Sequence, residues 1–267
     1  MASAALAESV DHRFVTSGAG DARASRLGAL DQVAGRRAGA RLQVRRADVA
    51  CLRDGHPMPR LMADPTFRYQ QHATALTAPH IAPINQFVDS IRDRDGRGWA
   101  PYVASLHGGV DAQVLSILRD PGPATQDGSG SGFLAIDNDD PTAERQVVLF
   151  ESAGISPRQV LPWNAYPWYF NRQPTASELA AGAEVIVELL ELLPALRVVL
   201  LQGRDAEAGW KKVARRLPAP IEEGGVTVLA TIHPGRQALF TPDREERARR
   251  VAHQEAAFLR AVELARR

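Results

Sequence analysis

The sequence contains a single cysteine, Cys51, among its 267 residues. A disulfide needs two cysteines, and a cysteine-rich zinc site or an iron–sulfur cluster needs about three or four thiolates. The chain by itself therefore cannot form a disulfide scaffold, a structural zinc site of that kind or an iron–sulfur cluster. We expect it to use neither a metal ion nor a cofactor.

Long apolar runs are also missing. No stretch approaches the roughly 18 consecutive apolar residues of a membrane-spanning helix. The first residues, MASAALAESVDHR, have neither the basic segment nor the apolar core of a secretory signal. The sequence predicts a protein with no membrane partner that is located in the cytoplasm.

The chain has almost no excess of charge of either sign. Lysine and arginine number 32, aspartate and glutamate number 31, and the formal net charge is +1. This excludes the global positive field of a non-specific nucleic-acid binder. Lys211 and Lys212 are the only lysines, so nearly every cation is an arginine, whose planar fork suits contacts with phosphate. The apolar fraction of 45% and charged fraction of 24% are those of a globular protein.

The first part of the chain differs in composition from the rest. Residues 1–60 are rich in Ala, Arg, Gly and Asp, and a helix is expected at 25–52, weakened by three glycines. We interpret residues 1–75 as a helical or irregular extension and residues 76–267 as the functional domain.

Downstream of residue 80, short apolar runs alternate with amphipathic segments. The runs predict buried strands, and the spacing of apolar residues in the segments predicts helices. We expect strands at 112–118, 159–163, 197–201 and 226–232, and helices at 81–94, 142–152, 175–193, 205–217 and 243–266. Such alternation is typical of a parallel sheet covered on both faces. The sequence therefore predicts an α/β fold: a three-layer αβα sandwich around a central, mostly parallel four-stranded sheet.

Polar turns containing Gly or Pro follow the expected strands. They read RDPGP at 119–123, WNAYPW at 163–168, QGRDA at 202–206 and HPGR at 233–236. Ligands of open α/β sheets bind beyond the carboxyl ends of the strands. A carboxylate (Asp120), an amide (Asn164) and an imidazole (His233) at three strand ends therefore mark a candidate site.

The order of these turns resembles the uracil-DNA glycosylase superfamily over roughly residues 80–260. In that superfamily the first strand ends in a motif such as GQDPY or NPG, where this chain has RDPGP. A base-stacking aromatic residue follows, and Phe133 lies thirteen residues after Asp120. The second strand ends in an Asn that reads the uracil edge, which corresponds to Asn164. The third ends in a Gly-containing turn, here QGRDA, and the last motif, HPS, corresponds to HPG from His233.

The resemblance implies a monofunctional DNA glycosylase of base-excision repair. Such an enzyme flips uracil out of DNA and hydrolyses its N-glycosidic bond, which leaves an abasic site; other damaged bases are further candidate substrates. Asp120 would stabilise the cationic sugar and orient the attacking water, and a neutral His233 would donate a hydrogen bond to the leaving base. The base would lie among Gly122, Phe133 and Asn164. The residues expected to contact DNA are Arg119, Arg204, Arg236 and Gln237.

The resemblance also implies the partner and the place of action. The expected partner is uracil-containing DNA, single- or double-stranded, bound by a monomer at the bacterial nucleoid. The loop 236–239 is a candidate wedge into the base stack.

Two positions depart from the superfamily pattern. Its common branch has Tyr two residues after the catalytic Asp, where the ring excludes the methyl group of thymine, and this chain has Gly122 there. The last motif ends in Gly235 instead of a Ser that often helps to bind phosphate. The sequence alone therefore does not define which bases the site accepts.

Alternative interpretations remain open. The same fold could serve a non-catalytic protein that binds DNA or abasic sites, although such a binder has no need of Asp120. An unrelated α/β hydrolase or nucleotide-processing enzyme is disfavoured, because the sequence has no GxSxG, Walker A or HExxH pattern. Taken singly, Asp120 could cap a turn, Asn164 could form an Asx turn, and His233 and Phe133 could be core residues.

Overall fold

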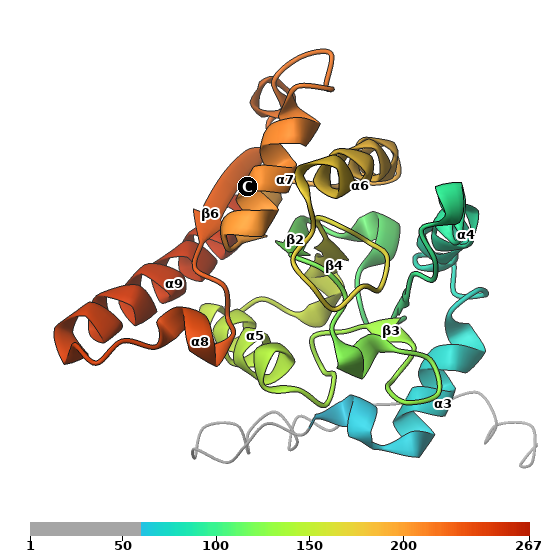
Figure 1. The fold of residues 1–267 in the computed structure, drawn as a ribbon, viewed down its shortest axis with the longest axis horizontal. Helices are drawn as coiled ribbons and strands as arrows, with labels where there is room; N and C mark the ends of the chain where they lie inside the picture. The colour runs from blue at the N-terminus through green and yellow to red at the C-terminus, as the bar shows by residue number, and fades with distance from the viewer. Residues whose placement is uncertain (1–59) are drawn as a thin grey trace, which may run out of the picture. The chain divides into compact units, whose positions relative to one another are not determined.

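The computed structural model describes residues 60–267 (Figure 1). Cys51, the expected helix at 25–52 and most of the expected extension lie outside the described residues. The rest of that extension consists of the 3-10 helix η2 (Leu61–Ala63) and the helix α3 (Pro65–Thr74). The described residues all belong to one unit, and the domain division that we expected at 75/76 stays a prediction.

The central sheet has four strands, all parallel, in the order β4-β2-β5-β6. Their bounds are β2 (Val114–Leu118), β4 (Val160–Asn164), β5 (Val198–Gln202) and β6 (Thr227–Thr231). Each coincides, to within a few residues, with one of the four strands expected from the apolar runs. A second, two-stranded parallel sheet pairs β1 (Tyr102–Val103) with β3 (Phe133–Leu134), which the sequence did not predict.

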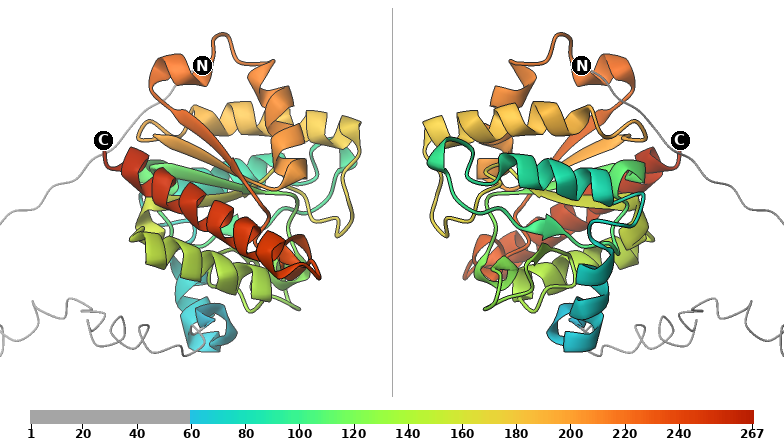
Figure 2. Two further views of the ribbon diagram at one scale, coloured as in Figure 1. Left: turned by 90° about the vertical axis from the view of Figure 1, so that its left-hand side faces the viewer. Right: turned by 90° about the vertical axis from the view of Figure 1, so that its right-hand side faces the viewer.

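Helices cover both faces of the central sheet. On one face lie α4 (Ala82–Ile91), α6 (Ala176–Leu190) and α7 (Arg204–Ala214); on the other lie α5 (Pro141–Ala153) and α9 (Arg244–Ala265). Figure 2 shows the sheet edge-on between these two layers. Successive side chains of a strand point to opposite faces, so Leu115 and Ile117 of β2 join one core cluster and Val114 the other. The expected α/β fold with three αβα layers is confirmed.

Several helices begin where a capping side chain accepts hydrogen bonds from their first backbone amides. Asp140 accepts from Thr142 and Ala143 at the start of α5, Thr175 and Glu178 form a capping box on α6, and Asp243 caps α9. Among the helices of residues 60–267, none combines the length and apolar character that a bilayer crossing requires. The described residues also form α8 (Arg236–Leu239) and the 3-10 helices η3 (Arg94–Gly96), η4 (Gly109–Asp111), η5 (Pro123–Thr125), η6 (Pro157–Gln159) and η7 (Ile221–Gly224).

The order of the strands creates a crevice at one end of the sheet. The chain leaves β2 toward α5 on one face, but it leaves the neighbouring strand β5 toward α7 on the opposite face. Connections that diverge in this way leave a crevice beyond the carboxyl ends of the two strands, where α/β proteins bind ligands. The turn that follows β2 contains Asp120.

Candidate active site

A cleft of about 760 Å³ opens at this crevice. Its walls are the turns that follow β2, β4, β5 and β6, together with the first turns of α5. Of the nine site residues expected from the sequence, eight line it: Arg119, Asp120, Gly122, Asn164, Arg204, His233, Arg236 and Gln237. The four strand ends therefore bring together residues that are up to 118 positions apart.

Asp120 lies in the cleft with only 4% of its side chain exposed. Its Oδ1 atom accepts a hydrogen bond from Nε of Arg119, and its Oδ2 atom is buried without a partner among the described residues. Burial raises the pKa of the Asp120 carboxyl above its usual value, and the Arg119 guanidinium opposes that rise. One oxygen is thus fixed by a cation, while the other is available to a molecule in the cleft.

His233 follows β6 and has a defined protonation pattern. Its Nδ1 atom accepts a hydrogen bond from the backbone amide of Gly235 at 2.9 Å. Nδ1 therefore carries no hydrogen, and the neutral ring holds its proton on Nε2. Burial, with a smaller contribution from the charge of Arg119, lowers the pKa of His233 below its usual value. At neutral pH the ring is a neutral hydrogen-bond donor.

Asn164 is the last residue of β4 and is 2% exposed. Its Nδ2 atom is buried and has no partner among the described residues. An unpaired amide donor is costly to bury, so its position in the wall of the cleft favours an acceptor on a bound ligand.

Gly122 lines the cleft, and the space beside its Cα is open. A Cβ atom built on Gly122 has no heavy atom within 4 Å. Nothing in its immediate surroundings explains why the position carries glycine, and a larger side chain could start there without a clash.

Phe133 does not line the cleft, and the expectation that it stacks on a bound base is corrected. Its side chain is fully buried, and its ring centroid lies 4.4 Å from that of His72. It packs there in a small core cluster with Met62 and Ala104. The reason is local: β3 pairs with β1, so the ring is held in that cluster, and it is Leu134 and Ala135 that reach the cleft.

Two amides in the cleft were missed by the sequence interpretation. Gln202 is the last residue of β5, and Gln146 lies in α5. Nε2 of Gln202 donates to Oγ of Ser116 at 2.6 Å and to Oε1 of Gln146 at 2.9 Å. Gln202 sits in the turn motif QGRDA at a strand end, so its position could have identified it, but no sequence signal distinguishes Gln146.

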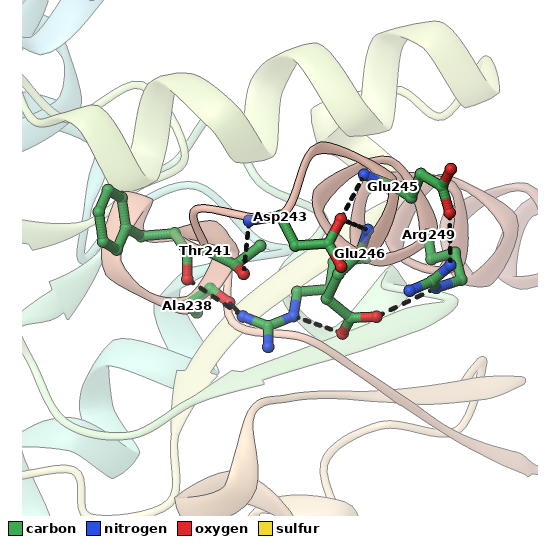
Figure 3. Close-up of polar contacts among 8 residues, drawn as sticks. Ala238, Thr241, Asp243, Glu245, Glu246 and Arg249 are labelled. Atoms are coloured by element: carbon green, nitrogen blue, oxygen red, sulfur yellow. Dashed lines mark hydrogen bonds and ion pairs between the residues drawn. The ribbon is translucent and has the colours of Figure 1, made fainter.

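The segment 238–240, beside the cleft, is attached to the helix α9 by hydrogen bonds (Figure 3). Arg250 donates from Nη1 to the backbone oxygens of Ala238 and Phe240, both at 3.2 Å, and from Nε to Oε1 of Glu246 at 2.9 Å. Phe240, which follows α8, is 77% exposed. The backbone that carries this exposed aromatic side chain is therefore attached to α9, close in sequence to the residues Arg236 and Gln237 that line the cleft.

The arrangement suits a reaction that separates charge. It places a buried carboxylate, a neutral imidazole donor and an amide in one cleft. Within residues 60–267, no group of three or more His, Cys, Asp or Glu side chains could hold a metal ion.

Comparison with known proteins agrees with this geometry. The family model described as the uracil DNA glycosylase superfamily matches residues 111–257, which include β2, β4, β5, β6 and every residue lining the cleft. A comparison with curated proteins gives no match. Because the family match covers more than half of its residues, the chain belongs to the uracil DNA glycosylase superfamily.

Proposed function

We propose that this protein is a monofunctional DNA glycosylase that flips uracil out of DNA and hydrolyses its N-glycosidic bond. The observation that carries the proposal is the buried carboxylate of Asp120, which shares the cleft with the neutral imidazole of His233. Members of the superfamily are generally glycosylases of DNA repair. The finer assignment to uracil rests on Asp120, His233 and Asn164.

Two opposite charges develop when the bond between C1′ and N1 breaks. The electron pair moves to N1, so the base becomes an anion and the sugar resembles an oxocarbenium cation. In our proposal, the Asp120 carboxylate stabilises the sugar cation, and its Oδ2 atom accepts a hydrogen bond from the attacking water. The oxygen of that water adds to C1′ and becomes the hydroxyl of the abasic sugar. The proton that the water loses ends on the released base, directly or through Asp120 and solvent, so the products are neutral uracil and an abasic site. Groups oriented beforehand toward developing charges supply much of the rate enhancement of enzymes.

The leaving base is stabilised by a neutral donor. The proton on Nε2 of His233 would donate to the developing anion at O2 of uracil. The hydrogen bond from Gly235 to Nδ1 supports this assignment, because it leaves Nε2 as the donating atom. A neutral donor stabilises the anion without itself losing a proton.

The base is recognised by its edge and not by an aromatic platform from Phe133. Asn164 would donate from Nδ2 to a carbonyl oxygen of the base. Gly122 would leave room beside the ring, so that the cleft could also accept bases larger than uracil. Either another residue would then exclude thymine, or thymine would also be a substrate.

DNA would be engaged by an arginine patch and an exposed aromatic residue. Arg119, Arg204 and Arg236 line the cleft and would meet phosphates. In duplex DNA the target base is hidden, so the stack must be opened at a cost of about a few kcal/mol. We extend the wedge expected at 236–239 to Phe240, whose exposed ring could enter the stack. The proposed partner is DNA, bound by one copy of the chain.

The test is excision from defined oligonucleotides. Purified protein is incubated with labelled strands that carry one uracil, single-stranded or paired, and cleavage is scored with and without alkali. The expected result is cleavage that requires alkali, since a monofunctional enzyme leaves an intact abasic strand. Asp120→Asn is the matched control. Tight binding of uracil-containing DNA with no excision by the wild-type protein would instead favour a non-catalytic binder on the same fold.

A further inference from the structure

The floor of the cleft holds a closed network of three side chains. Both hydrogens of the Gln202 amide are engaged, one by Oγ of Ser116 at 2.6 Å and one by Oε1 of Gln146 at 2.9 Å. Ser116 donates in turn to the same Oε1 atom of Gln146 at 3.5 Å. Because both amide hydrogens have partners, the orientation of the Gln202 amide is fixed.

This orientation leaves an acceptor unused. Gln202 is fully buried and lines the cleft. Its Oε1 atom has no hydrogen-bond partner among the described residues. Buried polar atoms are normally paired, and an unpaired one is costly. The atom therefore lacks a donor that a bound molecule could supply.

Asn164 carries an unpaired donor that complements this unpaired acceptor. The β2 residue Leu118 is in register with Asn164 of β4, and Ile117 is in register with Leu201 of β5. Gln202 therefore lies at the level of Asn164, on the other side of β2 and on the same face of the sheet. Their Cα atoms are about two strand spacings, or about 9–10 Å, apart. An unpaired donor, Nδ2 of Asn164, and an unpaired acceptor, Oε1 of Gln202, thus line the same cleft.

We propose that Gln202 is a second base-reading residue: its Oε1 atom accepts the ring N–H of a bound base while Asn164 donates to the adjacent carbonyl. The cleft then selects bases that carry a C=O beside an N–H, as uracil does. Cytosine presents the inverse pattern, an amino donor beside a ring acceptor. Its amino group would face the donor Nδ2 of Asn164, and its ring nitrogen would face the acceptor Oε1 of Gln202, so neither hydrogen bond could form. The inference rests on the proposed function and names the substrate class of its site.

The test measures binding of two small probes that differ only in the substituent at N3. 1-Methyluracil keeps the ring N–H at N3, and 1,3-dimethyluracil lacks it. Their dissociation constants are measured by calorimetry for the wild type, Gln202→Met and Thr231→Val. Thr231 is the matched control, because it is in register with Gln202 and its Oγ1 atom is also buried and unpaired, but it does not line the cleft.

The expected result is an affinity for 1-methyluracil that falls about tenfold in Gln202→Met, the effect of one lost hydrogen bond. The affinity for 1,3-dimethyluracil does not fall, and Thr231→Val resembles the wild type. Ser116→Ala keeps Gln202 but removes one of the oxygens that orient it, so it shows a smaller loss in the same direction. This variant decides the question if Gln202→Met does not fold.

Three results would overturn the inference: no binding of 1-methyluracil to the wild type, unchanged binding by Gln202→Met and Ser116→Ala, or equal losses for both probes. The excision assay reports on the proposed function separately. A wild type that binds 1-methyluracil selectively but excises nothing keeps the reading by Gln202 and rejects the enzyme. If the wild type excises uracil but the variants keep the wild-type preference for 1-methyluracil, the proposed function stands and the reading of the base by Gln202 is rejected.

Discussion

The backbone amide of Gly235 donates a hydrogen bond to Nδ1 of His233 at 2.9 Å, and this contact depends on the absence of a side chain at Gly235. A Cβ atom on Gly235 would lie 2.8 Å from Nδ1, and one on Gly203 would lie 3.1 Å from Cβ of His233. Two glycines from different strand ends therefore lie close to the side chain of His233. The departure from HPS to HPG fits this geometry: the Cβ atom of a serine here would lie 2.8 Å from Nδ1, so the ring or the backbone would have to move.

Asp120→Asn tests the central electrostatic assignment. The variant keeps the shape of the side chain but removes the charge that faces the sugar cation. The expected result is a protein that folds and binds uracil-containing DNA but excises uracil about 10²–10³-fold more slowly. Single-turnover kinetics and a binding assay on the same oligonucleotide measure the two quantities. Excision at the wild-type rate would remove Asp120 from the mechanism.

The pH dependence of excision tests the protonation states. The proposed reaction needs an ionised Asp120 and a neutral His233. Burial raises the pKa of Asp120 above 3.8 and lowers the pKa of His233 below 6.5. The single-turnover rate should therefore not fall as the pH is raised through neutrality, and it should fall at acidic pH, where Asp120 and His233 take up protons. A rate that falls from pH 6.5 toward pH 8 would contradict a neutral imidazole donor.

Asn164→Asp tests the reading of the base edge. The substitution replaces the unpaired Nδ2 donor by an acceptor, which opposes the carbonyl oxygen of uracil. We expect uracil excision to fall at least about 100-fold, because the cleft then leaves a buried polar group unpaired. Cytosine becomes at most a weak substrate, since Gln202 still presents an acceptor to its ring nitrogen. Both activities are measured on matched oligonucleotides, and unchanged uracil excision would place Asn164 outside the site.

Gly122→Tyr tests whether the open space beside Gly122 faces the base. The first side-chain atom fits without a clash, and the ring would fill the space beside the base. We expect uracil excision within about tenfold of the wild type and a loss of about tenfold or more for bulkier bases such as hypoxanthine or mismatched thymine. Excision rates on a panel of single-lesion oligonucleotides check this. An identical range of substrates in both proteins would show that Gly122 faces elsewhere.

Arg250→Ala tests the segment that carries Phe240. Without the two hydrogen bonds from Arg250, the backbone at Ala238 and Phe240 loses its attachment to α9. Excision from duplex should fall about tenfold more than excision from single strands, because only the duplex must be held open. Arg236→Ala should act in the same direction.

Arg249→Ala is the matched control for this prediction. Arg249 is the neighbouring residue of α9 and pairs with Glu245 and Glu246, but it donates no hydrogen bond to the 238–240 backbone (Figure 3). It should leave the ratio of duplex to single-strand excision unchanged. Equal losses on both substrates in Arg250→Ala would mean that the segment does not act on the base stack.

The elements and the edge of the sheet that carries the site were predictable from the sequence. Apolar runs located all four central strands, because a parallel sheet buried on both faces needs continuous apolar strands. All four run in the same direction, so their carboxyl ends share one edge, and Asp120, Asn164 and His233 had to lie along it. Residues at or just after the strand ends could therefore be assigned to this edge without any tertiary information.

Only the tertiary structure decided which side chains face one another. The pairing of β3 with β1 holds Phe133 in a core cluster, and two-residue strands leave too short a pattern to predict. Gln202 meets Ser116 and Gln146 across 86 and 56 positions of the chain, and Arg250 reaches back to Ala238 from another helix. Such contacts depend on how helices cross the sheet, whereas periodicity records only which face of an element is buried. The pattern of apolar residues along the chain thus determined the sheet edge at which the candidate site lies. Packing determined which polar side chains form the floor of the cleft.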